Sequence, residues 1–470
     1  MEFGVKITYE GNGETTKITP KSIKNIILMA LAQKKILKER DENAEKYKLD
    51  LLKKYDNYRK NIENNYNLEE IEKIWYTLIK EDYFESESTY FWQIFINTVH
   101  QSLFKDGLLK YVSSSEYFNL ISGLDNISHL LPFYDMWEIS RNILKSEKSK
   151  AFWINSSIKE IKKEYKSGNI KYNLAELKEH TDKYGYHSDK ELDVTYPCYS
   201  EEADPIIKNI KDLLILDDSY SPIKDKEKQK QEYIKQLEKI KKQISDKKYK
   251  KVLSKIEKMR KLLWWREEFR DVSTRFYYII RIYTIKLAKS YETEAIIEDI
   301  DDIWYSKIED IFNFITKKIS AEDLRNIIEK NKKYYTSFRN FMSENEIGDV
   351  FNKASTVKKI KKNDNVFFGI GSNNGTVTGI ARVIESLDEI DKLQKGDILV
   401  TKFTDTGWTS KFAILKGIVT EYGGILCHAS IVSREYGIPC IVSAENITKK
   451  IKDGTTITIN GETGEITGVK

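Results

Sequence analysis

Cysteine and long apolar runs are both scarce in this sequence of 470 residues. Its three cysteines, Cys198, Cys427 and Cys440, are too few for a disulfide framework, and no CxxC pair suggests zinc. No stretch approaches the ~18 apolar residues that a membrane-spanning helix needs. The first residues also lack the basic and apolar segments of a secretory signal peptide. We therefore expect a soluble, cytoplasmic protein.

An excess of charge of one sign is missing as well. Lys and Arg number 78 and Asp and Glu number 73, a net charge of +5. This balance gives no general reason to expect a nucleic-acid partner or a polybasic membrane anchor. The most charged segment, residues 223–262, keeps an apolar stripe that includes Ile234, Leu237 and Ile240, which predicts a helical hairpin with a solvated face. A nucleic-acid-binding arm is the poorer alternative, because glutamates dilute its positive charge.

Glycine is rare in the first three quarters of the chain. Of 22 glycines, 14 lie at or after Gly369, whereas seven of the eight tryptophans precede residue 310. This break predicts a multidomain protein, with a large, mostly α-helical domain at residues 1–348 and a small β/β/α domain at residues 375–470. Residues 349–374 would form a linker between them.

Two short glycine-containing runs complete this expected organisation. Residues 1–20 predict a hairpin around Gly11-Asn12-Gly13, a turn sequence that permits positive φ. The run Gly-Ser-Asn-Asn-Gly at 371–375 is predicted to act as a hinge for the C-terminal domain.

The segment GGILCHASIVSREYGIP, residues 423–439, is the most informative part of the chain. It predicts a glycine turn followed by a helix that ends near Gly437. His428 would lie in the first helical turn, where unpaired N–H groups and the helix dipole favour an anion. A phosphoryl group on this imidazole would therefore meet an anion site. The alternative is an ordinary surface or capping histidine.

Three sequence blocks support the first interpretation. They read GDILVTKFTDTGWTSKF, GGILCHASIVSREYGIP and DGTTITINGETGEI, in that order. Together they resemble the swivelling phosphohistidine domain of the PEP-utilising enzyme family, which includes phosphoenolpyruvate synthase, pyruvate phosphate dikinase and rifampicin phosphotransferase. The resemblance implies that His428 is phosphorylated. Ser410 and Ser443 depart from it, where proline and glycine are usual.

The helical part resembles the acceptor-binding domain of the rifampicin-phosphotransferase-like branch. Four blocks carry this similarity, at residues 120–140, 182–205, 262–288 and 302–312. The second block contains His187, a candidate general base or substrate hydrogen-bonding group, or else a loop histidine bonded to backbone.

Two arginines in the third block form a further candidate site. Arg266 and Arg270 lie one helical turn apart on one face, which suits a phosphoryl group or a carboxylate. The alternative is that they pair with acidic residues on neighbouring turns. Besides the catalytic His428, the candidate phosphate- and substrate-binding residues are therefore Gly424, Cys427, Arg434, Thr406, Arg266, Arg270, His187 and Glu191. Metal ligands are not identifiable.

The family's ATP-binding domain, which is of the ATP-grasp type, has no counterpart in this sequence. The first 350 residues hold eight glycines, none of them in a phosphate-cradling loop. The resemblance therefore implies a separate ATP-grasp subunit, which would use ATP and Mg²⁺ to charge His428, and a small-molecule acceptor on the helical domain. The chain would be an incomplete dikinase-type phosphotransferase subunit. Charging by PEP, a phosphocarrier that serves a protein partner and an inactive helical scaffold remain alternatives.

Overall fold

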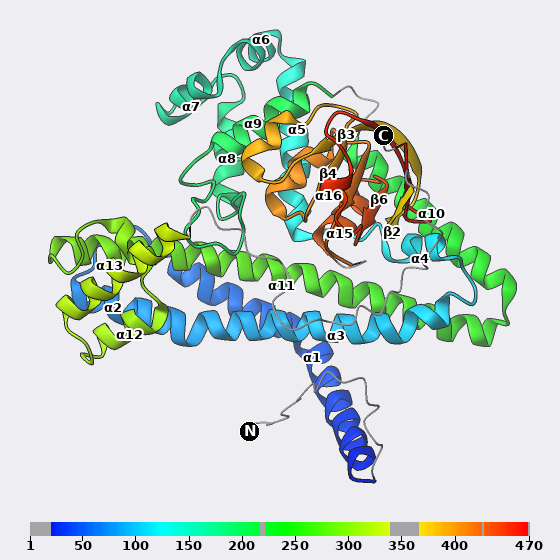
Figure 1. The fold of residues 1–470 in the computed structure, drawn as a ribbon, viewed down its shortest axis with the longest axis horizontal. Helices are drawn as coiled ribbons and strands as arrows, with labels where there is room; N and C mark the ends of the chain where they lie inside the picture. The colour runs from blue at the N-terminus through cyan, green and yellow to red at the C-terminus, as the bar shows by residue number, and fades with distance from the viewer. Residues whose placement is uncertain (1–19, 217–220, 339–365, 425–426, 469–470) are drawn as a thin grey trace.

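The computed structural model describes residues 20–216, 221–338, 366–424 and 427–468 (Figure 1). A large helical region comes first and a small region with a mixed sheet follows, which confirms the predicted fold class. The hairpin predicted for residues 1–20 lies outside the described residues except for Pro20.

The helical region is built from thirteen α-helices and three short turns of other helix types within the described ranges. They are α1 (Pro20–Lys60), α2 (Leu68–Thr77), η1 (Leu78–Tyr83), α3 (Phe84–Leu108), α4 (Ser114–Ile121), η2 (Ser128–Leu130), α5 (Leu131–Lys145), α6 (Glu147–Asn155), α7 (Ile158–Lys166), α8 (Leu174–Tyr184), α9 (Asp204–Leu214), α10 (Pro222–Gln243), α11 (Asp246–Thr293), η3 (Ile300–Tyr305), α12 (Ile308–Ile315) and α13 (Ala321–Ser337).

Local sequence signals fix where several of these helices begin. At α2, the Asn67 side chain accepts from the Glu70 N–H, and the Glu70 carboxylate accepts from the Asn67 N–H. Such a capping box satisfies two backbone donors that the first turn would otherwise leave unpaired. Proline occupies the first turn of α5, α9 and α10, where its missing N–H costs nothing.

The 48-residue helix α11 is the axis of the helical region. It lies alongside α1, α2 and α3 (Figure 1) and shares a core with them that includes Leu51, Trp75, Phe276 and Tyr283. Within residues 223–262, α10 ends at Gln243 and α11 begins at Asp246. Of the apolar stripe in this segment, Leu237 and Ile240 pack in a cluster with residues of α4, whereas Ile234 is exposed.

The C-terminal region is a mixed sheet with short helices. Its described strands, in the spatial order β1-β8-β7-β3-β4-β5-β6-β2, are β1 (Val366–Phe368), β2 (Ile370–Asn373), β3 (Thr376–Val383), β4 (Ile398–Thr401), β5 (Gly417–Thr420), β6 (Cys440–Val442), β7 (Thr456–Asn460) and β8 (Glu465–Thr467). Strands β3 to β6 run parallel, and the other pairs are antiparallel. Strands β4 and β5 are buried throughout, as central parallel strands usually are.

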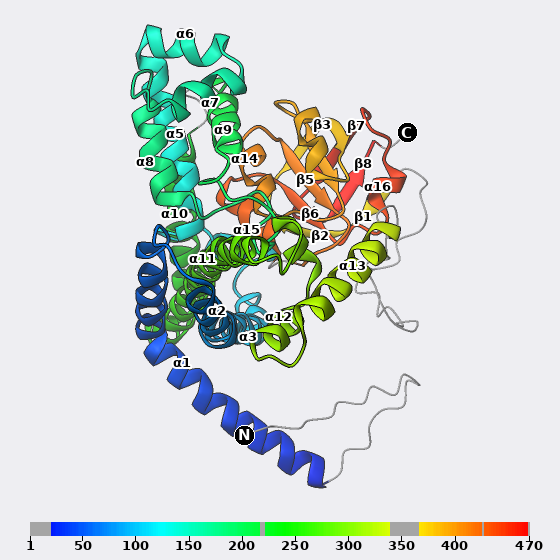
Figure 2. The same cartoon turned by 90° about the vertical axis from the view of Figure 1, so that its left-hand side faces the viewer.

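The helices of this region connect the strands. They are η4 (Leu387–Lys392), η5 (Thr406–Trp408), α14 (Thr409–Phe412), α15 (His428–Glu435) and α16 (Ile447–Lys450). Helix α15 lies between the sheet and α11 in both views (Figures 1 and 2). Its position places the first turn of α15 next to the helical region.

Part of the expected linker belongs to the sheet. Residues 349–365 of that segment lie outside the described residues, but residues 366–373 form β1 and β2, which pair with β8 and β6. At Gly371, in β2, an added Cβ would collide with the backbone oxygen of Gly461. Glycine at this position permits close approach of two backbones.

Candidate active site

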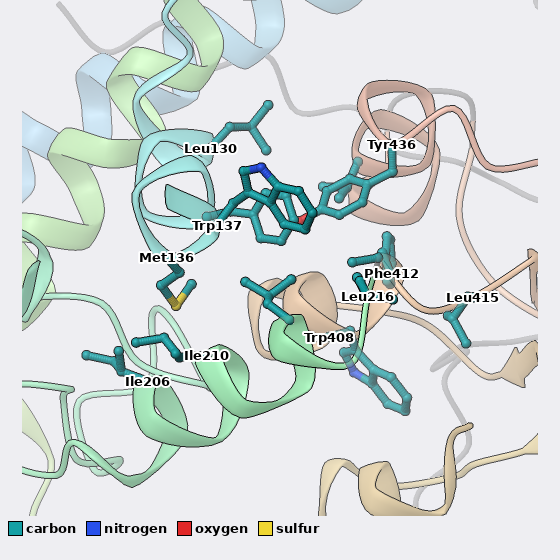
Figure 3. Packing of buried hydrophobic residues seen from close by; sticks show 14 of the residues in the cluster. Leu130, Met136, Trp137, Ile206, Ile210, Leu216, Trp408, Phe412, Leu415 and Tyr436 are labelled. Carbon is teal, nitrogen blue, oxygen red and sulfur yellow. The ribbon is translucent and has the colours of Figure 1, made fainter. Parts of the chain in front are cut away.

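The sheet region is docked on the helical region through a shared apolar core. Trp137 of α5 and Ile210 of α9 belong to the same buried cluster as Trp408, Phe412 and Tyr436 of the C-terminal region (Figure 3). The Phe133 and Tyr436 rings lie 4.8 Å apart between centroids. This contact holds α14 and α15 against α5.

Polar contacts surround this apolar interface. Lys411 pairs with Asp212, and Lys208 pairs with Asp391. The Gln229 amide of α10 donates to the backbone oxygens at the end of α15, at 2.6 Å to Arg434 and 2.8 Å to Glu435. The C-terminal end of α15 is therefore positioned by helical-region contacts.

His428 is the first residue of α15, as the sequence predicted. The segment before it adopts an extended backbone at Cys427, the N-cap residue. The Nδ1 atom of His428 lies 3.1 Å from the Thr404 hydroxyl, in the loop after β4. The Phe412 ring lies 5.9 Å from the imidazole, between centroids. The imidazole is thus hydrogen-bonded at Nδ1 and lies beside an aromatic ring.

The electrostatic environment keeps this imidazole neutral. Removal from water, together with the positive charge of Arg270 and the presence of His129, lowers the pKa of His428 to about 3. Desolvation disfavours the charged form of histidine, and a nearby cation does the same. At neutral pH, His428 is therefore an uncharged nitrogen base that faces a cationic group of the helical region.

Glu191 is the centre of the polar cluster opposite His428. One carboxylate oxygen lies 2.5 Å from His187 Nδ1, and the other lies 3.4 Å from Arg270 and 3.3 Å from the Thr274 hydroxyl. Burial alone would raise the pKa of Glu191, but His187 and Arg270 lower it to about 2. The structure thus brings together His187, Glu191 and Arg270, three of the residues that the sequence selected.

Arg266, the other arginine on this face of α11, has a different partner. It lies 3.2 Å from Glu267, which also lies 3.1 Å from His129 Nδ1. Against the effect of burial, Arg266 and His129 lower the pKa of Glu267 to about 2. Arg266 therefore pairs with a neighbouring carboxylate of α11, which was the expected alternative. Arg270 instead pairs with Glu191, which lies in a different segment.

Gly424 and Cys427 shape the turn that precedes His428. A Cβ at Gly424 would meet nothing within 4 Å, so packing does not require glycine there. The Gly424 carbonyl accepts from the Ser430 hydroxyl at 2.8 Å, and Cys427 Sγ lies 3.4 Å from the same hydroxyl. Ser430, one turn into α15, thereby ties both residues to the helix.

Arg434 lies at the other end of α15. Its guanidinium is 5.4 Å from the Phe118 ring of α4, and it lines a cavity of about 460 Å³ between the two regions. The structure does not bring it together with the Arg270 and Glu191 cluster. Thr406 begins η5, and its side chain lies outside what the structure describes.

Sequence reasoning missed three polar residues that lie at or near this site, namely Thr404, Asp405 and His129. All three belong to blocks that the resemblance had already singled out. Only the fold shows that Thr404, rather than another residue of its block, contacts His428. Glu267 is one of the acidic residues that were expected as alternative partners of the two arginines.

The site has no preformed metal centre within the described ranges. No group of three or more His, Cys, Asp or Glu residues there is arranged to hold a metal ion. None of the helices in those ranges combines the length and apolar character needed to cross a bilayer.

Comparison with known proteins relates this arrangement to a family. Residues 393–464, which include His428 and Thr404, match the model described as the mobile domain of PEP-utilising enzymes. Residues 90–267, which include His129, His187, Glu191, Arg266 and Glu267, match the model described as the rifampicin phosphotransferase fourth domain. The two matches therefore cover residues from both sides of the site, although Arg270 lies just beyond the second.

Individual relatives show the same pattern. The chain is 31% identical over 294 residues to a rifampicin phosphotransferase of Bacillus cereus, a match that covers 60% of this chain and 33% of that protein. It is 29% identical over 293 residues to a rifampicin phosphotransferase of Bacillus subtilis, with 60% and 33% covered. A probable phosphoenolpyruvate synthase of Methanothermobacter thermautotrophicus is 38% identical over 112 residues, with 24% and 16% covered. The chain spans about a third or less of the length of these relatives.

Proposed function

We propose that this chain carries a phosphoryl group on His428 and delivers it to a hydroxyl group of a small molecule bound by the helical region. The chain would thus be an enzyme, a phosphotransferase. The observation that carries the proposal is the position of His428, at the start of α15 and close enough to Arg270 and His129 for both to lower its pKa. A phosphoryl group there would meet backbone N–H groups and a guanidinium.

The hydrogen bond to Thr404 suits this role. In the tautomer with its proton on Nδ1, His428 donates to the Thr404 hydroxyl, and Nε2 keeps the lone pair that attacks phosphorus. A neutral imidazole is both a good phosphoryl acceptor and a good leaving group. Arg270 would stabilise the negative charge of the transferred group in the transition state.

The matches favour a hydroxyl-bearing acceptor over pyruvate. The similarity to rifampicin phosphotransferases extends over 294 residues, whereas the similarity to the probable phosphoenolpyruvate synthase covers 112. We therefore take rifampicin as the first acceptor to test. His187 would orient the acceptor beside Glu191.

The phosphoryl donor is proposed to be ATP with Mg²⁺, bound by a separate ATP-grasp subunit. Two carboxylates whose charges act on His428 are engaged by cations, Glu191 by Arg270 and His187 and Glu267 by Arg266 and His129, which leaves these two poorly suited to hold Mg²⁺. PEP is the alternative donor.

Phosphorylation of His428 is the decisive test. The full chain is treated with phosphoramidate, a small donor that phosphorylates imidazoles, and separately with ATP and Mg²⁺ plus an ATP-grasp partner, or with PEP. Peptide mass spectrometry under alkaline conditions should find a phosphoryl adduct on His428 and none there in His428→Ala. His100→Ala, a change at a buried histidine of α3, is the matched control and should leave the adduct in place.

Three further outcomes have defined meanings. Formation of phosphorylated rifampicin from the charged chain supports the proposed acceptor. Transfer only to another protein would instead indicate a phosphocarrier. Absence of the adduct with every donor would overturn the proposal.

A further inference from the structure

Asp405 lies in the loop of the mobile domain that contacts His428, and nothing above gives it a role. It follows Thr404, whose hydroxyl is bonded to the imidazole, and precedes η5. Its Oδ1 atom accepts from the Gly407 N–H at 3.2 Å, which fixes the carboxyl group within a tight turn. One carboxylate oxygen is therefore used to hold the loop, and the other is available for chemistry.

This turn packs closely against the helical region. A Cβ at Gly407 would collide with the backbone oxygen of Asp189, in the same loop of the helical region as His187 and Glu191. Asp405 is close enough to Glu191, Arg270 and Asp189 for all three to affect its charge state. The carboxyl group thus lies where the two regions meet, near the cation that also affects His428.

Two carboxylates of the cluster, Glu191 and Glu267, are poor proton acceptors. Glu191 pairs with His187 and Arg270, and Glu267 pairs with Arg266 and His129, so the pKa of each is lowered to about 2. His187 is itself bonded to Glu191 and only 5% exposed. Burial, by contrast, raises the pKa of Asp405 to about 6, with smaller contributions that oppose one another from Gly407, Glu191, Arg270 and Asp189. A base acts best when its pKa lies near the working pH.

The geometry points to Asp405 as the group that accepts the proton of the acceptor hydroxyl when the phosphoryl group leaves His428. This inference rests on the proposed function and specifies its transfer step. As the oxygen–phosphorus bond forms, the bond between phosphorus and Nε2 breaks. The hydroxyl proton moves to the Asp405 carboxylate, and the imidazole regains its Nε2 lone pair while keeping its proton on Nδ1.

The test separates loading of His428 from its discharge. Full-length wild type, Asp405→Asn and Asp189→Asn are loaded with phosphoramidate, and the adduct on His428 is followed by mass spectrometry in water alone and with rifampicin. Asp189→Asn is the matched control, because its carboxyl group is also removed from water at this interface but accepts a hydrogen bond from Tyr199 at 2.9 Å. Circular dichroism verifies that all three chains are folded.

We expect Asp405→Asn to load normally and to discharge at least ~10-fold more slowly than the wild type, within the range of general-base effects. Asp189→Asn should discharge at the wild-type rate. The wild-type rate should fall as the pH drops below about 6, because protonated Asp405 cannot take a proton, and Asp405→Asn should lack this decline.

Two results would overturn the inference while leaving the phosphohistidine intact. One is equal discharge of Asp405→Asn and wild type, both in water and with rifampicin. The other is a loss in Asp189→Asn as large as that in Asp405→Asn, which would indicate a general effect of charge at the interface. Failure to load His428 in any chain would instead contradict the proposed function.

Discussion

Arg270 has two electrostatic effects in the site. It pairs with Glu191 at 3.4 Å, and its charge contributes to the lowered pKa of His428. Its side chain is only 20% exposed, so water screens its charge weakly. Arg270 is therefore the residue best placed to neutralise a phosphoryl group carried by the imidazole.

Replacement of Arg270 tests this role. Arg270→Gln should slow discharge of phosphorylated His428 on the order of 100-fold, as loss of one preorganised donor typically does. The measurement is the decay of the His428 adduct in the presence of rifampicin. Arg275→Gln is the control, because Arg275 pairs instead with Asp271 at 2.8 Å and should leave discharge largely unchanged. Equal rates for Arg270→Gln and wild type would exclude this role.

At the scale of elements, the glycines of β2 and of the turn before α15 differ in how closely other atoms surround them. At Gly371 in β2, a Cβ would also lie 2.7 Å from the backbone oxygen of Glu462, and backbone cannot yield as a side chain can. At Gly424, the added Cβ would meet nothing within 4 Å. The first glycine is required by packing, and the second is not.

Alanine substitutions distinguish these two uses. Gly371→Ala should destabilise the mobile domain by about 1–3 kcal/mol, the usual cost of overpacking. Gly424→Ala should leave the unfolding midpoint nearly unchanged. If this substitution alters the protein, the change should be in the loading of His428. Urea unfolding followed by circular dichroism measures the first effect. A fully stable Gly371→Ala protein would contradict a packing requirement for glycine at this position.

At the scale of the whole molecule, a carboxyl group of α15 is buried in the folded protein. Glu435 is 8% exposed, and burial raises its pKa to about 7, although Arg434, His129, Arg260 and Lys226 oppose the rise. The usual pKa of a glutamate is 4.5. The folded and docked protein therefore binds a proton here between about pH 4.5 and 7 that the unfolded chain has lost, and its stability falls across that window as pH rises.

Glu435→Gln removes this cost. We expect the variant to be more stable than the wild type at pH 8 by up to about 3 kcal/mol, since one pKa unit corresponds to about 1.4 kcal/mol. The difference should shrink below about pH 7 and vanish near pH 4, where the wild-type carboxyl is protonated in both states. Thermal unfolding across this pH range gives the comparison. A pH-independent difference would show that Glu435 is not protonated on docking.

Local sequence signals were enough to predict the secondary structure and to single out His428 as the residue to examine. Apolar periodicity and the change in glycine content act over short stretches of chain, so the helical region, the charged helix pair and the sheet region could all be predicted. The position of His428 at the start of α15 also followed from local signals, namely the double glycine before it and Gly437 after it.

Which side chains face the imidazole, in contrast, followed from the packing of the folded chain. The separation of Arg270 from Arg266, the contact of Thr404 with Nδ1 and the location of Asp405 depend on contacts between segments that lie far apart along the sequence. Pairing with β8 and β6 likewise placed residues 366–373 in the sheet. Such long-range pairings and the desolvation of charges arise from packing, and no local pattern in the chain encodes them.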